Sequence, residues 1–299
     1  MKKIALILIV CVLLSLFGTS LVGAKTQNGL MWGAYDPNGP VSFEKLTGRQ
    51  PDMVATFIPW GKGGEFPVWF VPTVRDTNKT LLIFWELVNF SEKPGNNRIC
   101  DKNYSYDAIL KGTWDQYLKG FAGEAARYNG PVIIVPFPEM NLNETNWSGT
   151  RNNNSAAKHI QAFRRLREAF RQAGAGNVRF GWDVNSRSIP NQTGNQIADY
   201  YPGDVDYVGV DGFDLWNQTF AEIFDRPLKE LEQFNKPIMI FSWGCQEKPG
   251  KPAWIEDLGN VSRKHPLVVG WNLFNAKKER NWLVNSSPES LQTFQYITA

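Results

Sequence analysis

Residues 132–141 read VIIVPFPEMN, and this stretch decides the fold. A continuous apolar run leads directly into a carboxylate, Glu139. Short apolar runs of this kind are typical of parallel strands that helices cover on both faces. We therefore place one strand at residues 132–139. Seven similar runs lie on either side of it, at residues 30–35, 53–59, 80–87, 178–184, 207–213, 237–243 and 267–274.

Amphipathic segments separate these runs. Residues 155–173 form the clearest one, because Ser155 can cap its start, Gly174 can end it, and apolar side chains recur at helical spacing between them. Residues 106–127, 219–234 and 254–265 show the same pattern, and Pro227 should kink or split the second of these. Strands that alternate with helices in this way predict a (β/α)8 TIM barrel.

A doubly wound open sheet is the competing architecture. That fold normally carries a glycine-rich phosphate loop after its first strand, and no such loop follows residues 30–35. Residues 61–64, Gly-Lys-Gly-Gly, come nearest, but they lack the Lys-Ser/Thr ending of a phosphate loop. We interpret them as an ordinary flexible loop.

The first 24 residues have the pattern of a signal peptide, which leaves residues 25–299 as one barrel domain. Lys2 and Lys3 precede an apolar run, and Val-Gly-Ala at 22–24 suits a signal peptidase. An uncleaved membrane anchor is the alternative. We therefore expect a secreted or cell-surface protein, in which Cys100 and Cys245 either pair or stay separate thiols. Asn-X-Ser/Thr acceptors for glycosylation recur at Asn78, Asn89, Asn103, Asn143, Asn146, Asn153, Asn191, Asn217, Asn260 and Asn285.

Charge argues against two classes of partner. The formal net charge is +3, and removal of two signal-peptide lysines leaves +1. A nearly neutral chain without a Lys/Arg cluster disfavours nucleic acid and anionic membranes as partners. No metal or organic cofactor motif is present, so we expect none.

The strand ends predict a sugar site, because a barrel builds its active site at the C-terminal ends of its strands. Aromatic rings suit the C–H faces of sugars, and carboxylates suit their hydroxyl groups. His159 and His265 fall in the outer helices, so carboxylates are left as the acid–base groups, as in glycoside hydrolysis. The candidates are Trp85, Glu86, Glu139, Asp183, Trp182, Asp211, Asp214, Trp216, Trp243 and Trp271.

The chain resembles glycoside hydrolase family 26, a group of (β/α)8 β-mannanases and β-glucanases. Residues 80–87, 136–141, 200–213 and 236–240 carry the resemblance. It implies that Glu139 is the acid/base and that Asn141 and Trp147 contact the substrate. The family's strand-seven nucleophile is a Glu, but here that position is Ser242, and the His before the acid/base is Pro138. Asp211, Asp214 and Glu247 are the carboxylates that could substitute.

Three functions follow from this pattern. The first is an exported glycoside hydrolase that acts on β-linked polysaccharide. The second is a catalytically silent barrel that binds glycan through its tryptophans, which the missing nucleophile favours. The third is a structural glycoprotein that inherited the fold, since barrels host many chemistries.

Overall fold

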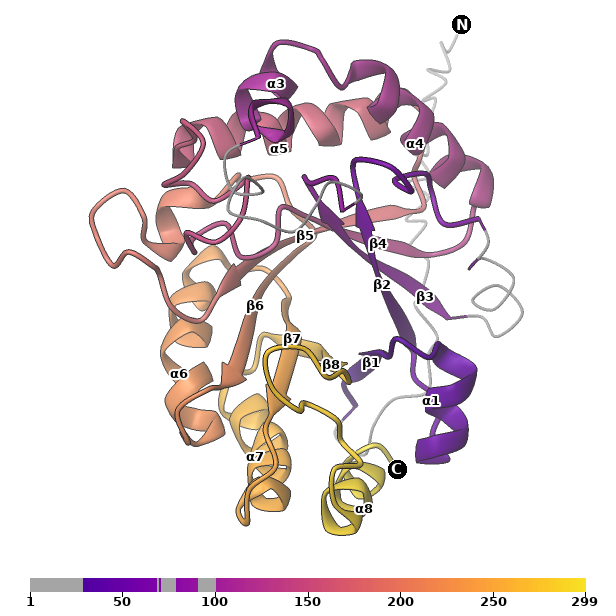
Figure 1. The fold of residues 1–299 in the computed structure, drawn as a ribbon, viewed down its shortest axis with the longest axis vertical. Helices are drawn as coiled ribbons and strands as arrows, with labels where there is room; N and C mark the ends of the chain where they lie inside the picture. Colours follow the sequence, from indigo (N-terminus) through magenta and orange to yellow (C-terminus); the bar gives the residue numbers. More distant parts are fainter. Residues whose placement is uncertain (1–28, 69, 71–78, 91–100) are drawn as a thin grey trace, which may run out of the picture.

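A computed structural model of the chain describes residues 29–68, 70, 79–90 and 101–299. Eight parallel strands close into a barrel in sequence order, with β8 paired to β1 (Figure 1). This confirms the predicted (β/α)8 barrel and excludes the open sheet. The strands are β1 Met31–Tyr35, β2 Met53–Pro59, β3 Thr80–Glu86, β4 Val132–Pro136, β5 Val178–Asn185, β6 Tyr207–Asp214, β7 Ile238–Cys245 and β8 Val268–Phe274.

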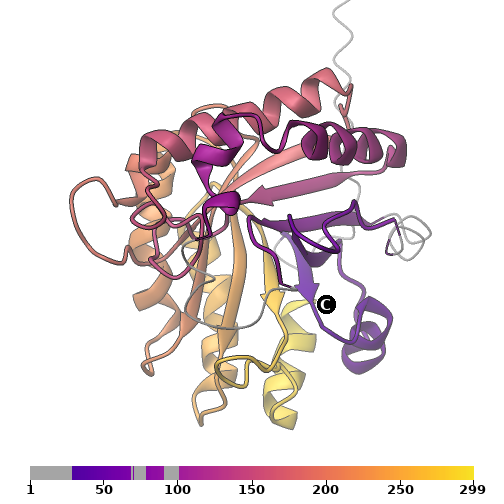
Figure 2. The same ribbon diagram turned by 45° about the horizontal axis from the view of Figure 1, so that its top comes forward.

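Helices surround this barrel, and α3, α4 and α5 lie together along one side of it (Figure 2). They are α1 Pro40–Thr47, α3 Tyr106–Leu110, α4 Asp115–Tyr128, α5 Ala156–Gln172, α6 Phe220–Leu231, α7 Lys251–Lys264 and α8 Pro288–Ile297. Short 3-10 turns lie at η2 Lys102–Tyr104, η3 Ile197–Tyr200 and η4 Glu232–Phe234.

Two helix predictions need correction. The helix expected over residues 106–127 is two helices, because Gly112 adopts a left-handed φ of 85° between them. Pro227 does not split α6, which continues past it to Leu231. Buried Phe224 and Leu228 on either side of the proline pack the helix against the barrel, which offsets the missing amide. The helix predicted at 155–173 is confirmed as α5, with Ser155 accepting the Lys158 N–H.

Side chains on each strand alternate between the barrel interior and the helix layer. The interior is filled by one apolar cluster: Met53, Ala55, Leu82, Phe84, Ile133, Val135, Tyr207, Met239 and Phe241. Phe241 fits there because Gly181 and Gly209 have no side chain. A Cβ at either position would lie within 2.4 Å of the Phe241 ring. The glycines therefore make room for the large ring in the narrow interior.

Four tryptophans that we predicted at the barrel mouth lie in the helix layer instead. Trp85 stacks on Phe121 of α4, Trp182 packs on Phe234, and Trp243 packs on Trp254 of α7. Trp271 packs against Phe294 of α8. All four are at most 1% exposed, so they stabilise the fold and cannot contact a glycan. The prediction was wrong for these residues because their strand positions point outward.

The structure bears on only some of the predictions about export, cysteines and glycosylation. Residues 1–24 and Cys100 lie outside the described residues, while the buried Cys245 thiol contacts the Asp214 carboxylate. Asn146 is 2% exposed and accepts the Asp101 N–H, so this glycosylation acceptor does not face solvent as expected. Within the described residues, no helix has the length and apolar character to cross a membrane.

Candidate active site

Glu139 sits in a strained turn just beyond β4. Phe137 and Glu139 both adopt left-handed φ angles, 56° and 57°, which non-glycine residues rarely do. Neighbouring strands hold this turn, because Phe137 N–H donates to the Trp85 carbonyl and Glu139 N–H donates to the Asp183 carbonyl. Backbone strain that the surroundings enforce is a recurrent property of active sites.

Trp147, which we predicted to contact substrate, supports this turn from behind. It is 4% exposed, and its Nε1 donates to the Pro138 carbonyl over 2.6 Å. The predicted role is therefore wrong, because the buried ring leaves no face for a sugar. Trp147 holds the residue next to Glu139 instead.

Asn141 has a similar supporting role. It is fully buried; its Nδ2 donates to the Asn185 carbonyl, and its Oδ1 accepts the Asn185 N–H. Asn185 in turn donates from Nδ2 to Glu139 Oε1 over 2.5 Å. The predicted substrate contact of Asn141 is therefore wrong, and the residue positions the group that orients the Glu139 carboxylate.

Glu86 and Glu139 face one mouth from neighbouring strands, and both keep part of their surface open to it. The pKa of Glu86 is raised to about 7, mainly because the group is buried; Lys278 opposes this rise and the Glu139 charge adds to it. Burial also raises the pKa of Glu139, against the Asn185 hydrogen bond and Lys278. The Glu139 charge thus disfavours ionisation of Glu86.

Lys278 supplies positive charge at this mouth. Protein atoms around its ammonium group lower its pKa by displacing water, but the negative charges of Glu279, Glu86 and Glu139 outweigh this and raise the pKa above its ordinary value. Its side chain is 68% exposed, so water screens much of this interaction. Lys278 therefore moderates the carboxyl pair without neutralising it.

Asp183 and Asp211 form a second carboxyl pair deeper in the barrel. They are 0% and 5% exposed, and burial raises the pKa of both well above the ordinary value. After burial, the Asp211 charge is the main cause that raises the pKa of Asp183, and the Glu139 charge raises the pKa of Asp211. Neither carboxyl oxygen of Asp183 has a hydrogen-bond partner in the described part of the chain. Ser242, at the position where family 26 has its nucleophile, is 2% exposed and thus closed off beside this pair.

Two carboxylates that we considered as substitutes lie away from the mouth. Asp214 is fully buried on the outer side of β6, where Lys248 Nζ approaches it to 2.5 Å. Glu247 accepts a hydrogen bond from Ser286 and lies 3.8 Å from Lys251 Nζ. Neither is placed to act opposite Glu139, because neighbouring strands and helices turn them outward.

Aromatic rings do line the mouth, but they are mostly Tyr and Phe. Tyr35 stacks on Phe274 with centroids 5.3 Å apart and meets Phe57 edge-on at 4.8 Å. Phe213 packs on Phe274 at 5.7 Å and on Trp282 at 5.2 Å. We call these five residues the mouth aromatic patch. Phe274 and Trp282 are buried, so Tyr35, Phe57 and Phe213 offer the partly exposed apolar surface that a sugar ring needs.

Trp216 is the predicted tryptophan that remains available to a glycan. It is 58% exposed, and the Arg187 guanidinium lies 3.8 Å from its ring centroid. The arginine holds one ring face, so the other edge and face stay open to solvent.

The histidines lie outside the mouth, as predicted. His159 is fully buried on α5, where Tyr106 Oη lies 2.8 Å from its Nδ1. His265 follows α7 and contacts Glu232 and Asp225. Among the described residues, no group of three or more His, Cys, Asp or Glu side chains is arranged to hold a metal ion.

Our sequence reasoning did not propose Tyr35, Phe57, Phe213 or Lys278 as site residues. Phe213 carried a usable signal, because it lies two positions after Asp211 and so shares its face of β6. Tyr35 and Phe57 end their strands at inward positions, which the same alternation would have indicated. Lys278 lies in the loop after β8, and no sequence pattern placed it near Glu86 and Glu139.

Comparison with known proteins supports the resemblance to family 26. The chain is 29% identical over 316 aligned positions to endoglucanase H of Acetivibrio thermocellus, with 99% of this chain aligned. It spans about a third of the length of that relative. No family model matches the chain.

Solved structures give the same result for the fold. A family 26 β-mannanase from Bacteroides ovatus superposes with a TM-score of 0.70 at 17% identity, over 91% of this chain and 88% of that one. The catalytic domain of a family 26 endo-β-1,4-mannanase from Bacillus sp. JAMB-750 has a TM-score of 0.68 at 15% identity, over 89% and 86%. The chain is therefore similar in sequence to this endoglucanase and has the barrel fold of these family 26 mannanases.

Proposed function

We propose that the chain is a glycoside hydrolase that cleaves β-linked glucan or mannan, with Glu139 as its general acid. The observation that carries this proposal is the pair of mouth carboxyls, Glu86 and Glu139, whose pKa values are both raised. A raised pKa lets a carboxylic acid keep its proton near neutral pH and give it to a leaving oxygen. The substrate class follows from the named relatives, an endoglucanase and β-mannanases.

Glu86 is the second carboxyl of the proposed reaction. It lies on β3, the strand next to the Glu139 turn, and its pKa responds to the Glu139 charge. Asp211 is deeper and only 5% exposed, while Asp214 and Glu247 point away. Glu86 is therefore the best placed of these carboxyls to serve as the base.

The proposed chemistry uses one water, one ionised carboxyl and one protonated carboxyl. Ionised Glu86 takes a proton from water as the water oxygen bonds to the anomeric carbon. Protonated Glu139 gives its proton to the glycosidic oxygen as the bond to that oxygen breaks. This direct displacement inverts the anomeric carbon and needs no carboxylate at Ser242, whereas the retaining route needs a nucleophile.

The mouth aromatic patch completes the proposed site. Tyr35 and Phe57 are partly exposed and can receive the C–H face of a sugar whose glycosidic oxygen faces Glu139. Asn185 fixes the Glu139 carboxylate, so the acid is oriented before substrate arrives. Together, these contacts should favour binding of a polysaccharide chain in the mouth.

Hydrolysis of β-glucan and β-mannan, followed by NMR of the first-formed reducing end, tests the proposal. We expect an inverted anomer, and a bell-shaped pH profile because one carboxyl must be ionised and the other protonated. Glu139→Gln and Glu86→Gln should each lower kcat by roughly 10²–10⁴-fold. Glu247→Gln is the matched control, because it removes a carboxyl outside the mouth and should leave kcat within twofold.

Three outcomes would contradict this proposal. A retained anomer would mean that another group acts as nucleophile. Full turnover in Glu86→Gln would remove Glu86 from the reaction. Glycan binding without turnover in the unaltered chain would favour the silent glycan-binding barrel.

A further inference from the structure

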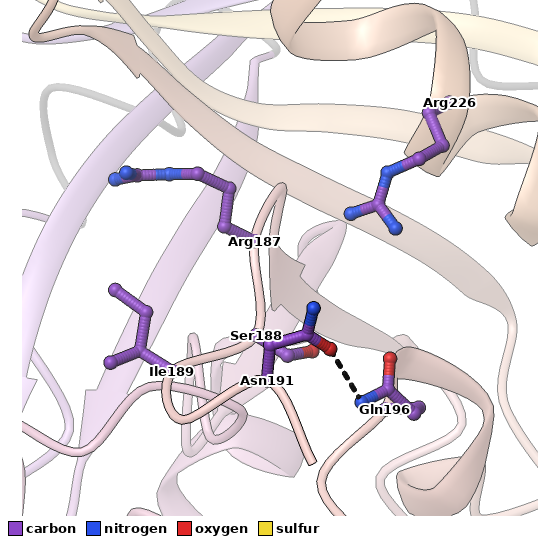
Figure 3. Close-up of a pocket in the computed structure, with 6 residues that line it drawn as sticks. All are labelled: Arg187, Ser188, Ile189, Asn191, Gln196 and Arg226. Atoms are coloured by element: carbon purple, nitrogen blue, oxygen red, sulfur yellow. Dashed lines mark hydrogen bonds between the residues drawn. The ribbon is translucent and has the colours of Figure 1, made fainter.

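A pocket lies beside the mouth, between the loop that follows β5 and helix α6. Its volume is about 270 Å³, near the roughly 300 Å³ at which small-molecule sites begin. Figure 3 shows Arg226 reaching from α6 toward the loop that carries Arg187 and Asn191. The lining residues are Arg187, Ser188, Ile189, Asn191, Gln196 and Arg226.

Both arginines in this pocket lack a carboxylate partner among the described residues. Arg226 donates from Nη2 to the Ser186 carbonyl over 3.1 Å, and Arg187 stacks on Trp216. Burial lowers the pKa of Arg187, and the charges of Glu144 and Glu139 offset this only in part. Two guanidinium groups without an ion pair create a positive field that favours an anion.

A nearby carboxylate, Glu222, forms no ion pair with either arginine among the described residues. Glu222 lines a smaller cavity of about 70 Å³ that shares both arginines with the larger pocket. Its Oε2 accepts hydrogen bonds from the Thr219 N–H and hydroxyl, where it caps α6. Glu222 is thus held at the helix start, and it forms no ion pair with Arg226 in the described part of the chain.

The loop that carries Arg187 is rigidly tied to the candidate active site. Asn141 Nδ2 donates to the carbonyls of Asn185 and Arg187, and Arg187 N–H donates to Asn185 Oδ1. Asn185 is also the residue that holds Glu139. Arg187 is therefore positioned in advance relative to the catalytic acid, which limits the entropy lost on binding.

The pocket is also continuous with the mouth. Phe213 lines the smaller cavity and at the same time belongs to the mouth aromatic patch. A glycan chain that places one sugar against the patch would therefore bring a neighbouring sugar to the two arginines. Asn191 Oδ1 is occupied by Gln196 Nε2, which leaves the Asn191 amide hydrogens for a ligand oxygen.

We propose that this pocket binds a negatively charged group, a carboxylate or a sulfate, on a sugar residue of the bound polysaccharide. This inference rests on the proposed function for the position of the chain in the mouth. It adds that the substrate carries acidic sugars or acidic substituents. Arg226 and Arg187 bind the anion, and Asn191 donates to a neighbouring oxygen.

NMR titration of the full chain with D-glucuronate, glucose 6-sulfate and D-glucose tests the proposal. We expect at least one anionic sugar to bind roughly tenfold more tightly than glucose, as charge-assisted hydrogen bonds to arginine require. The stronger of the two identifies the group as carboxylate or sulfate. Arg226→Gln should abolish the preference for the anionic sugar, because it removes one of the two guanidinium groups. The Arg226 side chain is exposed, so we expect the fold to stay intact.

Lys229→Gln is the matched control, since it removes one exposed positive charge from the same helix outside the pocket. Equal binding of all three sugars, or equal effects of Arg226→Gln and Lys229→Gln, would overturn the proposal. The titration measures no turnover, so its result is separable from the hydrolysis test. A preference for the anionic sugar without hydrolysis would support the anion pocket and contradict the proposed hydrolase activity. Hydrolysis without that preference would support the activity and contradict the anion pocket.

Discussion

The helix layer and the barrel mouth use aromatic residues in opposite ways. In the layer, Trp85 and Trp182 are fully buried between strands and helices, and ring contacts surround them. In the mouth, Tyr35, Phe57 and Phe213 keep part of their surface open beside ionisable groups. The tryptophans of the helix layer therefore serve stability, and the smaller rings of the mouth are available for binding.

Strand alternation explains the difference. Trp85 precedes Glu86, Trp182 precedes Asp183, and Trp243 follows Ser242 along their strands. Neighbouring residues in a strand face opposite sides, so a strand that presents its polar residue to the mouth turns its tryptophan outward. The same strand ends thus carry both the site and the packing of the helix layer.

The largest effect should come from breaking the helix layer. Trp85→Ala should lower the free energy of unfolding by about 4 kcal/mol, because it removes a buried ring and its hydrogen bond to Tyr117. Denaturant unfolding measures this change. Glycan affinity of the folded fraction should stay within twofold. A clear loss of affinity at unchanged stability would mean that Trp85 faces the ligand after all.

A second layer residue should make stability fall on the acid side. Burial lowers the pKa of His159 to about 3, below the 6.5 of an exposed histidine. The unfolded chain therefore takes up a proton first, and stability that is present above pH 6.5 is lost toward pH 3. The loss down to pH 3.5 should be on the order of 4 kcal/mol.

His159→Gln tests this, because glutamine can still pair with Tyr106 but does not titrate. Unfolding free energies between pH 7 and 3.5 should fall less steeply in the variant than in the unaltered chain. Parallel curves for the two proteins would show that His159 is not buried in its neutral form.

The mouth should have the opposite pH dependence. Glu86 has a folded pKa of about 7 against 4.5 when exposed, so stability present below pH 4.5 is lost as the pH rises through 7. This amounts to on the order of 3 kcal/mol by pH 8. Glu86→Gln should therefore stabilise the protein at pH 8, even though it removes the proposed base.

Unfolding at pH 5 and pH 8 measures this effect, with Glu247→Gln as the control carboxyl outside the mouth. A stability gain combined with lost turnover is the expected trade-off for a functional site. An equal gain in both variants would assign the effect to net charge rather than to the mouth.

The fold was largely predictable from sequence, because it depends on local patterns. Residues 53–59 form the predicted strand without change, and the runs at 80–87 and 207–213 shift by one residue at the C-terminal end. Continuous apolar runs determine such strands almost alone. The break at Gly112 was missed because a single glycine inside an amphipathic pattern is often tolerated.

Of the proposed site, only the carboxyl groups could be named from the sequence. Glu139 and Glu86 follow from the rule that barrel strands end at the active site. Lys278 and Arg187 could not be predicted, because their positions depend on how the loops after β8 and β5 fold over the mouth. Loop conformation depends on distant contacts such as those of Asn141, which no local pattern records.

The smallest effect should come from Trp216, the exposed member of the predicted set. Trp216→Ala should weaken binding of β-linked hexasaccharides about fivefold, roughly 1 kcal/mol, because it removes an open ring and the platform under Arg187. Unfolding free energy should change by less than about 0.5 kcal/mol, as for most exposed positions. Tyr296→Ala is the control, an exposed aromatic residue on α8.

Titration with neutral and acidic sugars then separates the two roles of this ring. A loss shared by D-glucose and D-glucuronate would mean that Trp216 contacts the sugar directly. A loss confined to D-glucuronate would mean that the ring acts by holding Arg187 at the pocket. Equal affinity in Trp216→Ala and Tyr296→Ala would contradict both roles and would leave the mouth aromatic patch as the binding surface.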